Sequence, residues 1–96
     1  MGQIKLSSVQ LEVLKLLKEG WELGVDIYTI GHTVVTRRAR MQKYGLGHGD
    51  PYKYFNVRVI DALERKGLIK HLPNNYLMLE PTRYILTEEG KEYGEN

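Results

Sequence analysis

The stretch that decides the fold is Asn56-Val57-Arg58-Val59-Ile60-Asp61-Ala62-Leu63-Glu64-Arg65-Lys66-Gly67-Leu68-Ile69. Its apolar positions 59, 60 and 63 fall on one side of a helix, and Gly67 continues that side. Gly67 also follows the last periodic residue, where a left-handed cap ends a helix. The spacing predicts a helix over 56–66 with Asn56 as N-cap, and then a strand over 68–71. Arg58, Asp61 and Arg65 lie on the opposite helix face, free to touch a partner.

A second motif, Arg83-Tyr84-Ile85-Leu86-Thr87-Glu88-Glu89-Gly90, predicts a strand, an N-capping Thr87 and a short helix. We expect the strand over 68–71 to pair with a return strand over 82–86. Pro73-Asn74-Asn75 is the turn signal. The apolar run Tyr76 to Leu79 is expected either to fold back on the core or to contact a partner subunit.

This order resembles the winged-helix DNA-binding family, in which a recognition helix ends in Gly-Leu-Ile and the wing returns through Leu-Thr-x-x-Gly. The chain carries both signatures, as Gly67-Leu68-Ile69 and Leu86-Thr87-Glu88-Glu89-Gly90. The resemblance implies an α+β winged-helix fold that binds double-stranded DNA, as a transcription regulator. Trp21-Glu22-Leu23-Gly24 and Gln42-Lys43-Tyr44-Gly45-Leu46-Gly47 are similar to segments of small uncharacterised winged-helix proteins from phages and mobile elements.

The first half of the chain predicts a helix and then a β-hairpin. Ser7 and Gln10 form a capping box at the start of a helix over 8–19, which Gly20 ends. Leu23, Val25 and Ile27 alternate with other residues at the strand period, and residues 33–36 are all β-branched. We therefore expect a hairpin over 21–43, inserted between the first helix and the recognition helix.

Residues 44–54, with three alternate glycines, are expected to form an irregular packed loop. Asp50 before Pro51 is a rival N-cap for the helix, although Asn56 fits better. A phosphate-cradling role is less favoured, because the loop lacks the Gly-Lys-Ser/Thr ending of a P-loop. We expect Tyr52 and Tyr54 to pack under this loop, with stacking on a base or sugar as the alternative.

The composition predicts a single cytoplasmic domain, residues 1–96, that is not an enzyme. With 42% hydrophobic and 27% charged residues it is typical of a globular protein, and no apolar run is long enough to span a membrane. There is no cysteine, and none of His32, His48 and His71 has a Cys or acidic partner at metal-ligand spacing, so neither a metal nor a cofactor is expected. No nucleophile–base pair stands out.

Charge is unevenly distributed along the chain. Residues 36–70 hold nine basic and three acidic residues, whereas residues 71–96 hold two basic and five acidic ones. This basic block, which includes the suspected recognition helix, predicts a surface that faces a polyanion. The expected phosphate contacts are Arg38, Arg40, Lys43, Lys53, Arg65 and Lys70.

Base readout is expected from the start of the helix. Arg58 suits guanine, Asp61 suits cytosine, and Val57 lies beside them. Arg37 should point to the core side of its strand, opposite Arg38 and Arg40. Two structural alternatives stay open: an Arg58–Asp61–Arg65 ladder of surface ion pairs, and a charged edge strand that only blocks aggregation.

The function expected from these features is sequence-specific binding of double-stranded DNA, with a homodimer as a further expectation. One alternative is a winged helix used for protein–protein contact through residues 76–79. The other is RNA binding through the tyrosines and the basic strand.

Overall fold

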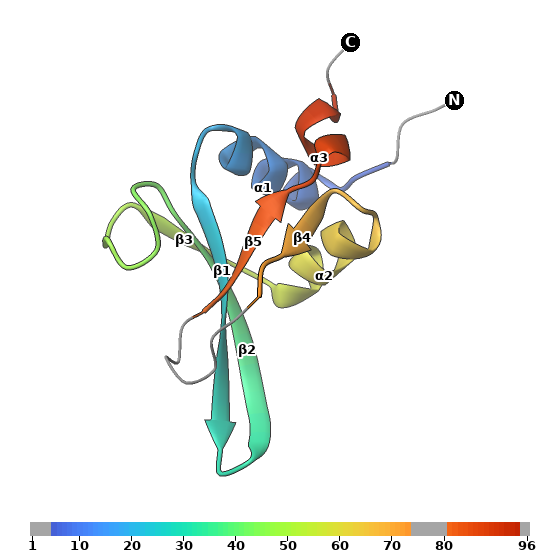
Figure 1. Cartoon of the computed structure of the whole chain (residues 1–96). Helices are drawn as coiled ribbons and strands as arrows, with labels where there is room; N and C mark the ends of the chain where they lie inside the picture. The colour runs from blue at the N-terminus through green and yellow to red at the C-terminus, as the bar shows by residue number, and fades with distance from the viewer. Residues whose placement is uncertain (1–4, 74–80, 95–96) are drawn as a thin grey trace.

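The computed structural model describes residues 5–73 and 81–94, with the backbone alone at 34 and 35. Three helices lie toward one end of the molecule, and a long hairpin extends away from them (Figure 1). The five strands form one antiparallel sheet in the order β3-β2-β1-β5-β4. In chain order the elements are α1 (Ser8–Lys18), β1 (Glu22–Ile30), β2 (Thr33–Gln42), β3 (Tyr52–Phe55), α2 (Val57–Arg65), β4 (Ile69–His71), β5 (Thr82–Leu86) and α3 (Glu88–Glu92). This confirms the predicted α+β class, with a hairpin between the first and second helices.

The predicted helix over 56–66 is confirmed as α2. The side chain of Asn56 caps it by accepting a hydrogen bond from the Arg58 N–H at 2.9 Å. At the other end Gly67 has φ of 78°, and the Leu68 N–H donates to the Leu63 carbonyl. This pairing, with the Gly67 N–H on the Glu64 carbonyl, is the Schellman motif, which reverses the chain within two residues. The chain therefore enters β4 directly, one residue later than expected.

The two sequence motifs, Gly67-Leu68-Ile69 and Leu86-Thr87-Glu88-Glu89-Gly90, contact each other in the fold. The Thr87 hydroxyl caps α3 by accepting from the Gly90 N–H, and it also donates to the Gly67 carbonyl at 2.6 Å. The Thr87 N–H donates to the Leu68 carbonyl. Gly90 packs so tightly against that carbonyl that a Cβ atom there would overlap it. The glycine turn after α2 and the start of α3 are thus one structural unit, built on the β4–β5 pair.

The hairpin of β1 and β2 is confirmed, and its register places Leu23 opposite Met41 and Val25 opposite Ala39. A register shift after Tyr28 inserts one extra residue into β2. β5 pairs with β1 only at residues 23–25, and β3 pairs with β2 only at residues 39–42. Residues 26–38, which we call the arm, therefore form a two-stranded ribbon, with no third strand beside it among the residues that the structure describes.

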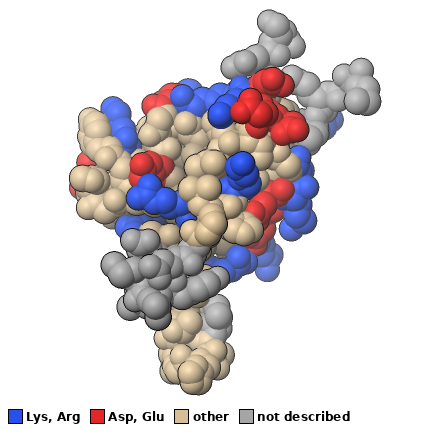
Figure 2. Space-filling view, viewed as in Figure 1, with Lys and Arg blue, Asp and Glu red and all other residues tan. Residues whose placement is uncertain are grey.

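The end of the arm carries no charge. Residues 27–36 contain no Lys, Arg, Asp or Glu, and the arm projects as an uncharged tip in Figure 2. Ile30 is 75% exposed there, and Ile27 and Tyr28 are also exposed. The core lies at the opposite end of the sheet, between its inner face and the helices. Its most deeply buried members are Val13, Leu23, Ala39, Met41, Ile60, Leu63, Leu68 and Ile69.

One prediction about residues 44–54 was wrong, because their last part begins β3. Tyr52–Phe55 pairs with β2, Tyr54 lying opposite Arg40 and Phe55 opposite Ala39. The glycine segment itself is a loop, as expected, but only Gly45 and Leu46 are half-buried and residues 47–51 are exposed. The buried side chain of Gln42 holds it by donating to the Gly49 carbonyl and accepting from the Gly47 N–H, each at 2.9 Å.

Candidate nucleic-acid interface

The outward face of α2 carries two exposed arginines, Arg58 and Arg65. They are seven residues apart, so they lie almost in line along the helix, about 10 Å from each other at the backbone. Ile60 and Leu63 are fully buried on the opposite side. Within the described ranges, neither arginine has a carboxylate at ion-pair distance. Their charges are therefore available to an outside anion.

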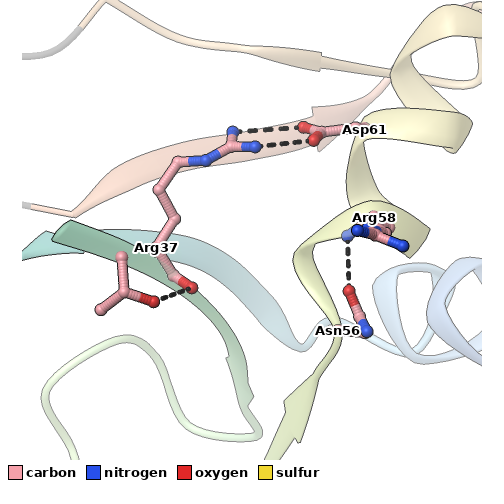
Figure 3. Close-up of polar contacts among 5 residues, drawn as sticks. Arg37, Asn56, Arg58 and Asp61 are labelled. Carbon is pink, nitrogen blue, oxygen red and sulfur yellow. Dashed lines mark hydrogen bonds and ion pairs between the residues drawn. The ribbon is translucent and has the colours of Figure 1, made fainter. Parts of the chain in front are cut away.

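Asp61 lies between these arginines. It was expected to be free to touch a partner, but it forms an ion pair within the domain. Figure 3 shows its two oxygens facing the guanidinium of Arg37 from β2, at 2.8 and 3.4 Å. The hydrogen bonds raise the pKa of Arg37 above its ordinary value. Arg37 points to the core side of its strand, as predicted. The alternative of an Arg58–Asp61–Arg65 ladder does not form either, because Asp61 pairs across the fold with a residue 24 positions away and not along its own helix.

Val57, the third expected readout residue, is half-buried and packs against the core cluster. Its side chain therefore belongs to the contact between α2 and the rest of the domain. Of the three, Arg58 alone keeps its polar end exposed and without an acidic partner among the residues described. The first turn of α2 thus presents one long cation and the N-terminal end of the helix dipole, both favourable to an anion.

The expected phosphate contacts are divided between two sides of the domain. Ala39 and Met41 face the helices, so their neighbours Arg38 and Arg40 project from the other side, which we call the outer face of the sheet. Lys70 alternates with the buried Ile69 and lies on the outer face too. Because α2 covers the inner face, these residues lie on the opposite side of the sheet from Arg58 and Arg65.

Several of these cations already have partners. Arg40 Nε lies 3.0 Å from Asp26 Oδ2, and Lys53 Nζ lies 2.6 Å from Glu12 Oε2 on α1. Lys43 lies over the ring of Tyr44, 5.5 Å from its centroid. Arg65 and Lys70 are the predicted phosphate contacts that stay exposed with neither kind of partner in the described part of the chain.

A row of aromatic side chains on the outer face was missed. Tyr52 and Tyr54 do not pack under the glycine loop; they project from β3 with their rings 5.2 Å apart, edge to face. Arg38 follows in the row, with its guanidinium 5.1 Å from the Tyr54 ring and 5.8 Å from Tyr28 on β1. The Tyr-x-Tyr spacing is the signal that could have found it, because on a strand both rings face one way.

The described residues were also compared with the patterns of metal sites and of membrane-spanning helices. No cluster of three or more metal-ligating side chains occurs among the residues that the structure describes. None of the helices in those residues has the length and apolar character of a membrane span. Comparison with protein-family models, with curated proteins and with solved structures gave no match.

Proposed function

We propose that this domain binds double-stranded DNA through α2, as a transcription regulator of winged-helix type. The observation that carries the proposal is the alignment of Arg58 and Arg65 on the outward face of α2, with no acidic partner in the described residues. The carboxylate between them is neutralised by Arg37. The face therefore has a net positive charge, although an acidic residue lies at its centre.

The order of the elements supports the same proposal. α1 is followed by a strand, and α2 is followed by the pair β4 and β5, with β5 beside β1. A recognition helix that follows a helix and a strand and precedes a two-stranded wing is the order that the winged-helix plan uses, and this order supports the proposal for α2. The hairpin partner β2 and the short β3 occupy the part of the chain where that plan has a further helix.

The two arginines have different roles in the proposed complex. Arg58 is in the first turn of α2, where a helix entering the major groove usually reaches base edges, and its guanidinium fits guanine O6 and N7. Arg65 is in the last turn and contacts a phosphate. Ala62 lies between them on the outward face and is small enough to let the helix approach the groove closely.

The test is competition binding of Arg58→Ala, Arg65→Ala and Lys15→Ala on a selected site and on random duplex. Lys15 is an exposed cation on α1, so its variant controls for the loss of one charge. Arg58→Ala should cost about 1–3 kcal/mol on the selected site and much less on random DNA. Arg65→Ala should weaken both similarly and reduce the salt slope by roughly 1. A parent protein that binds no duplex, or equal losses in all three variants, would contradict the proposal.

A second candidate function is protein–protein contact, and the exposed apolar end of the arm favours it. Ile27, Tyr28 and Ile30 are all exposed on this projecting arm, whose residues 27–36 contain no Lys, Arg, Asp or Glu. The segment Tyr76 to Leu79, expected to carry this contact, lies outside the described residues. Failure of duplex binding in a folded parent protein would favour this function over the first.

A further inference from the structure

The outer face of the sheet carries a second site, separate from α2. Its centre is the row Tyr52, Tyr54, Arg38 and Tyr28, which crosses three neighbouring strands, β3, β2 and β1. Tyr28, Tyr52 and Tyr54 are 44%, 46% and 53% exposed. These rings are about half exposed, and they lie on the side of the sheet that none of the described helices covers.

Arg38 forms no ion pair with the acidic residues described around this row, so its guanidinium can bind a ligand. In the strand register Asp26 lies directly opposite Arg38, yet its carboxylate pairs with Arg40, one strand pleat away. The guanidinium of Arg38 therefore has no carboxylate partner in the described residues and is held by two tyrosine rings. Such a group is pre-positioned both to stack on a base and to donate hydrogen bonds to a phosphate.

A cleft of about 220 Å³ adjoins the row on the same face. Arg40 and Arg83 line it together with Leu46, Gly47 and Pro81. Leu46 and Pro81 cover Gly24 of β1, where a side chain would collide with them. The cleft brings two further guanidinium groups beside the tyrosines, although each has one acidic neighbour, Asp26 or Glu22. The face as a whole keeps a positive balance, which suits a polyanion.

We propose that this outer face binds single-stranded nucleic acid, by stacking unpaired bases on the tyrosines and holding the backbone with Arg38. Duplex DNA does not fit the row, because its bases are stacked on each other and expose no ring face to a protein surface. Stacking on aromatic rings is tolerant of sequence, so little base preference is expected. The site works independently of α2, which lies on the other side of the sheet.

The experiment measures fluorescence anisotropy of a labelled oligothymidylate of about 15 nucleotides, with the full chain and four variants. Tyr54→Ala removes a ring from the middle of the row and should weaken binding about 5- to 150-fold. Tyr44→Ala removes a tyrosine that is more exposed than Tyr54 (66% against 53%) and lies outside the row, and it should bind like the parent. Tyr54→Phe keeps the ring and should also bind like the parent. Arg38→Lys keeps the charge but not the planar group, so it should weaken binding while leaving the salt slope unchanged.

Two further measurements separate this site from the proposed duplex interface. Arg58→Ala should leave oligothymidylate binding unchanged, and Tyr54→Ala should leave duplex binding unchanged. Thermal melting establishes that each variant is folded. If Tyr54→Ala is not folded, Arg38→Lys, which should also lose affinity, takes its place, and parent-like binding of Arg38→Lys then overturns the proposal. The proposal is overturned if the parent binds no oligothymidylate. It is also overturned if Tyr54→Ala binds like the parent, if Tyr54→Phe loses affinity despite keeping its ring, or if Tyr44→Ala loses as much as Tyr54→Ala. Any of these results would leave the row as cross-strand packing alone.

Discussion

Replacing Asp61 with Asn tests the central feature of the proposed duplex interface. Asp61 Oδ2 lies 2.8 Å from Arg37 Nη2, and the two side chains are 29% and 40% exposed. If Asp61 reads a cytosine, its loss should weaken binding to the selected site. If Asp61 instead restrains Arg37, its neutralisation should strengthen binding, because one anion disappears from the α2 face and one guanidinium is released. The two mechanisms therefore predict opposite changes in the affinity for the selected site.

The magnitudes follow from the exposure of the pair. A half-exposed bidentate ion pair contributes about 0.5–1 kcal/mol to stability. Since each kcal/mol moves the melting temperature of a domain this size by about 4–8 °C, the variant should melt at most about 8 °C lower. One additional phosphate contact steepens the salt dependence by roughly 0.9 in the log–log slope. Between roughly 50 and 200 mM salt, the affinity of Asp61→Asn should therefore fall roughly 3.5-fold more than that of the parent.

The assay is duplex titration at several salt concentrations, beside Glu88→Gln. Glu88 forms a 3.4 Å ion pair with Lys91 on α3, so its variant makes the same charge change away from α2. Asp61→Asn should bind more tightly than the parent at low salt and with a steeper slope, whereas Glu88→Gln should change little. Weaker binding of Asp61→Asn to the selected site, at unchanged affinity for random duplex, would refute the restraining role and restore base readout.

Two further predictions concern stability. Gly90→Ala should destabilise the domain by about 3 kcal/mol or more, because its Cβ meets the Leu68 carbonyl, which is rigid backbone. Gly67→Ala has open space and only the strain of φ 78°, so it should cost roughly 1–2 kcal/mol, and chemical denaturation that ranks the two in reverse would contradict this. Burial, and after it the charge of Glu64, raises the pKa of Tyr84. The neutral phenol of Tyr84 contributes its whole share of the folding free energy below pH about 10, and this share is lost as the pH rises through the raised pKa. The melting temperature of Tyr84→Phe should therefore decrease less steeply at alkaline pH than that of the parent.

Local signals predicted much of the fold. Asn56, the apolar spacing of α2 and Gly67 act within a few residues of each other, so their pattern was readable without knowledge of the rest of the chain. The same holds for the capping box at Ser7 and Gln10, which is present. The hairpin was readable because the β-branched run at 33–36 disfavours a helix. By contrast β3 has four residues, and Tyr-Lys-Tyr-Phe is too short to show a period beside a glycine loop.

The candidate site was harder to predict, because it depends on contacts between distant segments. The Arg37–Asp61 pair joins residues 24 positions apart and exists only when β2 lies beside α2. Strand alternation did place Arg38 and Arg40 away from the core. Since the helix covers the core side of the sheet, the same alternation implies that these two arginines and Arg58 lie on different sides of the domain. That step requires the layer arrangement, which the residue pattern does not contain.

The two ends of β1 differ in local stability, because one end lies inside the sheet and the other lies in the arm. At Leu23 and Val25, β1 has neighbouring strands on both sides and the core beneath it. Beyond Asp26 its only strand neighbour in the described part of the chain is β2, and residues 27–30 are exposed. Backbone amides near the tip can therefore exchange with solvent through local opening of the ribbon, while those at the base exchange only when most of the domain unfolds. A gradient of hydrogen-exchange protection should run along β1, and the arm can open and close many times within the lifetime of one folded molecule.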